Sequence, residues 1–95
     1  MVEKSECVYK FVYTKSAIKD IPKLKTAHLE EKAKNIIELI KVNPFKNPPP
    51  YEKLIGNLSG ALSRRLNIQH RLVYEVLEEE KTIKILSMWS HYERL

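Results

Sequence analysis

The 95-residue sequence has little cysteine and little glycine, and both shortages exclude classes of site. Cys7 is the only cysteine, so no internal disulfide can form, and no cysteine–histidine group has the spacing of a zinc site. With two glycines, the chain has no Gly-rich loop of the kind that cradles nucleotide phosphates. We therefore expect a protein of a reducing compartment that uses no metal and no cofactor.

Long hydrophobic runs are also missing. The opening segment "MVEKSECVYKFVY" contains no apolar stretch of signal-peptide length, and no later stretch is long enough to span a bilayer. The expected location is therefore the cytoplasm. Because 43% of the residues are hydrophobic, we expect a folded chain, with residues 1–95 forming a single domain around one modest core.

Negative charge is the scarcer sign. The chain carries 17 lysines and arginines against 12 acidic residues, for a formal net charge of +5. An excess of positive charge favours an anionic partner, such as nucleic acid, an acidic protein or a membrane surface. Charge alone does not choose among these partners, because most lysines of a small domain are simply solvated.

The first half of the chain predicts one strand and two helices. Cys7–Tyr13 is aromatic and β-branched, as strands are. Thr14 is a candidate N-cap for a helix that Pro22 should kink, shorten or restart, and Thr26 is a second candidate cap. From His28 to Val42, apolar residues recur at helical spacing with charged residues mostly opposite, which predicts an amphipathic helix.

The second half predicts a sheet. A proline-rich stretch, "NPFKNPPPY", ends the helix; a rigid linker is the favoured interpretation, and a ligand for a proline-binding module is the alternative. Short polar links then join three strand-like runs, which predicts antiparallel neighbours. The expected fold is α+β: a small antiparallel sheet, made of the N-terminal strand and a C-terminal three-stranded meander, packed against two helices. The three runs are Gly60–Ile68, His70–Leu77 and Thr82–Tyr92.

Arginines recur along these predicted strands. Arg64 and Arg65 are adjacent, and Arg71 follows His70. Successive strand residues point to opposite faces, so one member of each pair should face the helices or the rim of the sheet. Guanidinium groups that share one face form an anion site. The alternative is that these arginines form salt bridges with nearby glutamates, Glu75 or Glu78.

An acid and a histidine complete a possible catalytic set. Glu52 follows the prolines, and His91 lies near the end of the last strand beside Trp89 and Tyr92. Metal-free RNA cleavage needs a base for the ribose 2′-OH, cations for the phosphate and an acid for the leaving 5′ oxygen. The alternatives are a surface carboxylate and an idle terminal histidine. By alternation, Trp89 and His91 should share a face with the earlier isoleucines, Ile83 and Ile85.

Four motifs, "NLSG", "SRR", "HRLVY" and a near-terminal "HY", occur in an order and spacing that resemble the Txe/YoeB toxins, a branch of the RelE-type superfamily. The resemblance implies a RelE/YoeB-like fold and the toxin of a type II toxin–antitoxin pair. It further implies an mRNA endonuclease that acts in the ribosomal A site, without a metal, through attack by the substrate's own 2′-OH.

Individual roles follow from the same resemblance. Glu52 matches the family's general base, and Arg65 and Arg71 match its phosphate-binding arginines. His91 matches the general acid, and Tyr92 matches the adjacent tyrosine that orients the nucleotide. Two neighbouring cations, Arg64 and Lys53, are further candidates for RNA contact.

Partners are implied as well. The family suggests a cognate antitoxin with an acidic segment that folds over the cleft, the ribosome with its RNA and message, and a possible homodimer. Two other functions stay open: a non-catalytic binding module that has the toxin fold, and a ParE-like inhibitor of gyrase, which lacks the acid–base set.

Overall fold

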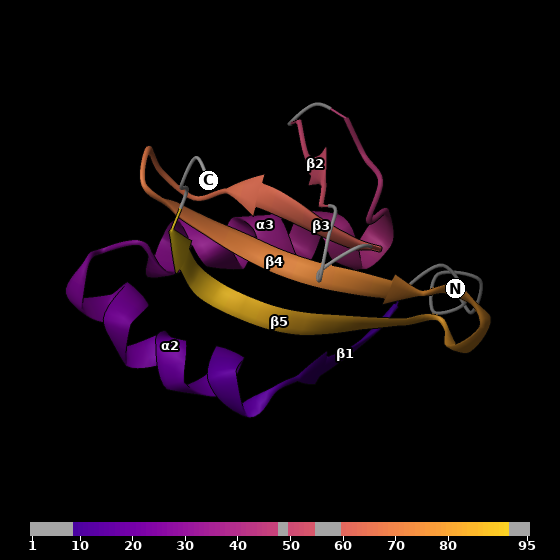
Figure 1. The fold of residues 1–95 in the computed structure, drawn as a ribbon, viewed down its shortest axis with the longest axis horizontal. Coiled ribbons are helices and arrows are strands. Elements are labelled where there is room, and N and C mark those ends of the chain that lie inside the picture. Colours follow the sequence, from indigo (N-terminus) through magenta and orange to yellow (C-terminus); the bar gives the residue numbers. More distant parts are fainter. Residues whose placement is uncertain (1–8, 48–49, 55–59, 92–95) are drawn as a thin grey trace.

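The computed structural model describes residues 9–47, 50–54 and 60–91, and for Ser90 and His91 it describes the backbone alone. In these residues two α-helices and five strands follow one another along the chain (Figure 1). A short 3₁₀ turn, η2, lies in the last hairpin. The bounds are β1 (Lys10–Tyr13), α2 (Lys15–Thr26), α3 (Glu30–Val42), β2 (Glu52–Lys53), β3 (Ala61–Arg65), β4 (His70–Leu77), η2 (Glu78–Glu80) and β5 (Thr82–His91).

The strands form one sheet in the order β1-β5-β4-β3-β2. The predicted α+β fold and the β3–β4–β5 meander are confirmed. Two features differ from the prediction. β1 pairs with β5 in parallel, because the chain leaves β1 through two helices rather than through a hairpin, so the sheet is mixed. A two-residue strand, β2, adds an antiparallel edge beside β3.

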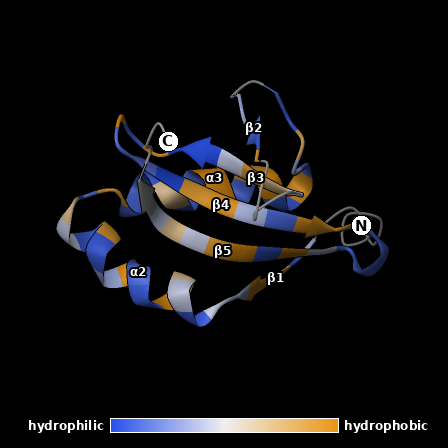
Figure 2. Cartoon of the chain, viewed as in Figure 1, coloured by the Kyte–Doolittle hydropathy of each residue, from blue (hydrophilic) through white to orange (hydrophobic). Residues whose placement is uncertain are grey.

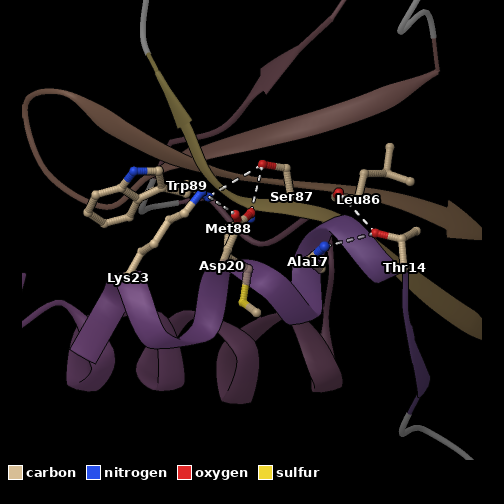
Figure 3. A network of polar contacts seen from close by, with 8 residues as sticks. All are labelled: Thr14, Ala17, Asp20, Lys23, Leu86, Ser87, Met88 and Trp89. Atoms are coloured by element: carbon tan, nitrogen blue, oxygen red, sulfur yellow. Dashed lines mark hydrogen bonds and ion pairs between the residues drawn. The ribbon is translucent and has the colours of Figure 1, made fainter. Parts of the chain in front are cut away.

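Helix α2 begins where the sequence predicted and continues through its proline. The Thr14 side chain accepts a hydrogen bond from the Ala17 N–H at 3.1 Å, as an N-cap does (Figure 3). The predicted end or restart at Pro22 was wrong, because α2 is one helix: the ring lies on the exposed side, and buried Asp20 and Leu24 lie on either side of it.

The second capping prediction was also wrong. Thr26 is the last residue of α2, and its hydroxyl donates a hydrogen bond to the Pro22 carbonyl at 3.1 Å. Helix α3 instead begins after Leu29, without a side-chain cap. It covers most of the amphipathic segment predicted for His28–Val42.

The core lies between the helices and one face of the sheet. Helix α3 lies behind β3 and β4 in Figure 1, and α2 lies along β5. Figure 2 shows that the central parts of β4 and β5 are largely hydrophobic, whereas the turn between them is hydrophilic. One buried cluster joins the elements, and its members include Ala17, Leu24, Ala33, Ile36, Ile40, Leu62, Leu72, Tyr74, Ile83, Ile85 and Met88.

Pairing between β4 and β5 shifts register twice near the end of β5. At each shift β5 contains one more residue than β4, which is a β-bulge. The alternation expected along this strand is therefore interrupted, and Met88 rather than Ser87 follows Ile85 into the core. The pairs that bracket the shifts are Tyr74–Ile85, Val73–Ser87 and Arg71–Ser90.

We expect Thr14→Ala to lower the free energy of unfolding by about 1–2 kcal/mol, because it removes the N-cap of α2. The same hydroxyl also contacts the carbonyls of Ile85 and Leu86 at 3.1 Å. Urea unfolding of the variant measures the loss. Thr26→Ala, at an exposed helix end, is the matched control and should change stability by less than about 0.5 kcal/mol. Equal losses in both variants would contradict this role of Thr14.

Candidate active site

The site is built around an ion pair between β2 and β4. Arg71 Nη1 lies 2.8 Å from Glu52 Oε1 and donates a second hydrogen bond to Ser63 Oγ at 2.5 Å. Glu52 lies opposite Ser63 on the neighbouring strand, and Arg71 lies opposite Arg65, so the register brings these side chains together. The Arg71 side chain is 8% exposed and that of Glu52 is 55% exposed. The buried guanidinium of Arg71 is thus paired with a carboxylate that solvent can reach.

The Glu52 carboxyl is held in its ionised form. The hydrogen bond from Arg71 lowers its pKa below the ordinary 4.5, and the positive charges of Arg71 and Arg65 lower it further. Partial burial opposes this shift but does not cancel it. At neutral pH Glu52 is therefore an anion that can accept a proton.

A groove of about 380 Å³ opens beside this pair. Its cations are one lysine from α3 and arginines from β3 and β4, while Glu52 is its only carboxylate among the described residues. An opening with this balance of charge suits a phosphodiester. The lining residues are Lys32, Ile36, Pro50, Tyr51, Glu52, Ser63, Arg64, Arg65, Leu66, Asn67 and Arg71.

Two groove residues, Ser63 and Lys32, were not predicted from the sequence. Ser63 hydrogen-bonds Arg71, and Lys32 reaches the groove from α3. Strand alternation from Arg65 places Ser63 on the same face, so that signal was present in the sequence. No local pattern distinguishes Lys32 from the other lysines of an amphipathic helix.

Arg64 lies in the interior, at 1% exposure, although it is also among the residues that line the groove. Its Nη2 donates hydrogen bonds to the carbonyls of Pro44 at 3.1 Å and Lys46 at 2.8 Å. Its Nε donates to the Tyr74 hydroxyl at 3.0 Å. These contacts favour a packing role for Arg64 over the direct RNA contact that the sequence suggested.

The contacts of Arg64 also reach the segment that leads into Glu52. Its guanidinium carbon lies 4.9 Å from the centre of the Tyr51 ring, and Tyr51 immediately precedes Glu52. The Tyr74 hydroxyl donates to the Pro44 carbonyl at 2.7 Å, so one buried network holds both Pro44 and Tyr51. Arg64 therefore helps to place the carboxylate without touching it.

Lys53 lies apart from the groove. It follows Glu52 on β2, so it takes the alternate position on the strand. It lines a neighbouring hollow with Phe45 and Leu62 instead. The structure therefore does not bring Lys53 to the Glu52–Arg71 pair.

The end of β5 runs beside Arg71. Ser90 lies opposite Arg71, and the His91 backbone lies opposite His70. The Trp89 ring stacks on the His70 ring, with centroids 3.8 Å apart and an interplanar angle of 19°. The His91 side chain and all of Tyr92 lie outside the described residues, so their predicted roles remain predictions.

Among the described residues, no three histidine, cysteine or acidic side chains gather in a way that could hold a metal ion. In the same part of the chain, neither helix is both long and apolar enough to cross a membrane.

The family model of the YoeB-like toxins of bacterial type II toxin–antitoxin systems matches residues 13–92. This chain belongs to that family. A relative, the toxin YoeB of Synechocystis, is 41% identical over 59 residues, which is 62% of this chain and 66% of the relative. The match to that relative thus spans just under two thirds of its length.

Solved structures of YoeB toxins share the fold. A YoeB/ParE toxin from Agrobacterium tumefaciens superposes with a TM-score of 0.78 at 30% identity, covering 87% of this chain and 99% of that one. The YoeB dimer from Staphylococcus aureus gives a TM-score of 0.74 at 31% identity, with coverages of 88% and 98%. A YoeB–YefM toxin–antitoxin complex from S. aureus matches equally well, with a TM-score of 0.74 at 31% identity and the same coverages.

We expect the Glu52 carboxyl to titrate with a midpoint below 4.5, followed by ¹³C NMR of its side chain. Because the folded-state pKa is lowered, the pair contributes stability above pH 4.5 that is lost as the pH falls through that midpoint. Arg71→Gln should raise the midpoint, since the hydrogen bond from Arg71 is the largest cause of the shift. Arg65→Gln should raise it less. A midpoint that Arg71→Gln leaves in place would contradict the pairing.

Arg64→Ala should destabilise the fold by about 3 kcal/mol, because it leaves buried carbonyls and a phenol without their charged donor. Arg65→Ala is the matched control, since Arg65 is exposed, and should cost less than about 1 kcal/mol. Urea unfolding of the two variants compares neighbouring, chemically identical side chains. Similar losses would show that Arg64 has no special role in the core.

Proposed function

We propose that this toxin is a ribosome-dependent endoribonuclease that cuts mRNA in the ribosomal A site without a metal. The observation that carries the proposal is the buried Arg71 guanidinium held against the exposed Glu52 carboxylate beside a basic groove. Membership of the YoeB-like toxin family supports the same conclusion.

In the proposed reaction, Glu52 removes the proton from the ribose 2′-OH, and the 2′ oxygen attacks the adjacent phosphorus. Arg71 and Arg65 stabilise the negative charge that develops on the phosphate oxygens. His91 donates a proton to the departing 5′ oxygen, and Tyr92 orients the nucleotide by stacking or hydrogen bonding. The nucleophile belongs to the substrate, so DNA should not be cut.

The lowered pKa of Glu52 is compatible with a role as base. In the free protein, Arg71 directs its Nη1 at the carboxylate. A bound phosphate would compete for that guanidinium, weaken the hydrogen bond to Glu52 and add a second negative charge nearby. Both effects raise the carboxyl pKa and so strengthen the base when substrate is present.

Partners follow from the proposed activity and from the relatives. The YefM complex of the staphylococcal relative supports an antitoxin partner for this chain, and the staphylococcal YoeB dimer supports self-association. The groove cations and the net charge of +5 suit ribosomal RNA, with binding that weakens as salt rises. Such a toxin acts in the cytoplasm.

The test is cleavage of a defined message on programmed ribosomes, mapped by primer extension. The parent should cut within the A-site codon, and Glu52→Gln, Arg71→Ala and His91→Gln should each slow cutting by about 10²–10⁴-fold. Glu79→Gln is the matched control for the loss of a carboxylate, because Glu79 lies in the η2 turn, and should cut at the parental rate.

Each other outcome has a distinct meaning. A parent that leaves the message intact would overturn the nuclease proposal and favour a non-catalytic module. Inhibition of gyrase supercoiling by that same preparation would favour ParE-like activity. Full cutting by the three site variants would refute the assignment of the residues while leaving the nuclease in place.

A further inference from the structure

Asp20, the chain's only aspartate, is a buried carboxylate on α2 that does not line the groove. It is 6% exposed and accepts a hydrogen bond from the Met88 backbone N–H at 3.0 Å (Figure 3). The Ser87 hydroxyl donates to the same oxygen at 3.4 Å, and Lys23 Nζ lies 3.6 Å from the other. Because a buried charge is costly unless it is bonded, these contacts account for its presence there.

The hydrogen bond from Met88 to Asp20 lies at an irregular point of β5. Met88 lies between Ser87, which is opposite Val73, and Ser90, which is opposite Arg71. That interval contains the second register shift, where a bulge leaves backbone groups outside the sheet's hydrogen-bond ladder. The Asp20 carboxylate accepts the Met88 N–H within the stretch that contains this second shift, and so ties that stretch of β5 to α2.

A second contact holds the same bulged stretch of the strand. Trp89 stacks on His70, the β4 residue that precedes Arg71. Met88 is thus held from α2 and Trp89 from β4, and only Ser90 separates Trp89 from His91. Because the residues between the bulge and the end of β5 are few and extended, we expect a change at the bulge to shift the end of the strand as well.

We infer that Asp20 is a positioning residue for the proposed acid: by holding Met88, it sets the course of the end of β5, where the His91 backbone lies opposite His70, the neighbour of Arg71 on β4. This inference rests on the proposed function for its effect on rate. The placement of the strand end can be measured independently of any activity.

The first experiment compares Asp20→Ala with Asp20→Asn in the ribosomal cleavage assay, at a temperature where both variants are folded. The alanine variant should lose about 10- to 100-fold in kcat while KM changes by less than about 3-fold, because misplacement of a catalytic group affects the chemical step. Asparagine keeps an oxygen that accepts the Met88 N–H, so it should restore kcat to within about 3-fold of the parent.

Lys23→Ala is the matched control on the same helix. It removes the exposed partner of Asp20 but leaves the bond to Met88 intact, so kcat should stay within about 2-fold of the parental value. A loss as large as that of Asp20→Ala would overturn the inference, because it would locate the effect in the ion pair rather than in the strand.

A double-mutant cycle separates positioning from general damage to the fold. In the His91→Gln background, Asp20→Ala should cause less than about 2-fold further loss, since the acid that it places is already absent. The same loss in both backgrounds would overturn the inference, because it would show that Asp20 acts through the rest of the protein.

Amide NMR provides the readout that does not need the proposed function. Asp20→Ala should speed hydrogen exchange at Met88 and shift the amide signals of Ser90 and His91, whereas Asp20→Asn should leave them close to the parental positions. Unchanged signals at Ser90 and His91 would refute the placement. If the parent cuts no message, the proposed function is wrong. The NMR comparison still tests whether Asp20 sets the position of the end of β5.

Discussion

The candidate site depends on one buried arginine that is held by side chains of two other strands. Arg71 reaches from the central strand β4 and meets both Ser63 of β3 and Glu52 of β2. Strand β2 has only two residues, too few to stay paired by their backbone alone. The ion pair and the Arg64 network therefore secure this edge together, and the groove owes its shape to both.

Arg64 and Arg65 are adjacent in the sequence but have different roles, because neighbouring residues of a strand point to opposite faces of the sheet. Arg64 points into the core and bonds carbonyls of the segment before Glu52, whereas Arg65 is exposed and lowers the pKa of that carboxyl. The general rule that one member should face inward was correct. Which member does so depends on the register of β3 with β4, and that pairing is a long-range property.

Sequence patterns predicted what local periodicity determines. They identified the amphipathic helix that became α3, the meander and the cap at Thr14, whereas Glu52 and Arg71 were singled out by the resemblance and their contact was not predicted. They failed where contacts between distant segments determine the structure. Helix α2 continues past Pro22, with Asp20 and Leu24 buried on either side of it, and β1 pairs in parallel with β5. The bulges of β5 were not predicted either, because the carboxylate that holds one of them comes from α2, a distant part of the sequence.

The proposed chemistry explains why rigidity is supplied from two directions. A reaction without a metal has no ion to draw base, phosphate and acid together, so the protein itself must fix each of them. The base side is held from within the core by Arg64 and its bonds to the segment before Glu52. The strand that carries the proposed acid, β5, is held from α2 through Met88 and from β4 through the His70–Trp89 stack. Since Arg71 lies on β4, between β2 and β5 in the sheet, each buried network holds the chain on one side of that arginine.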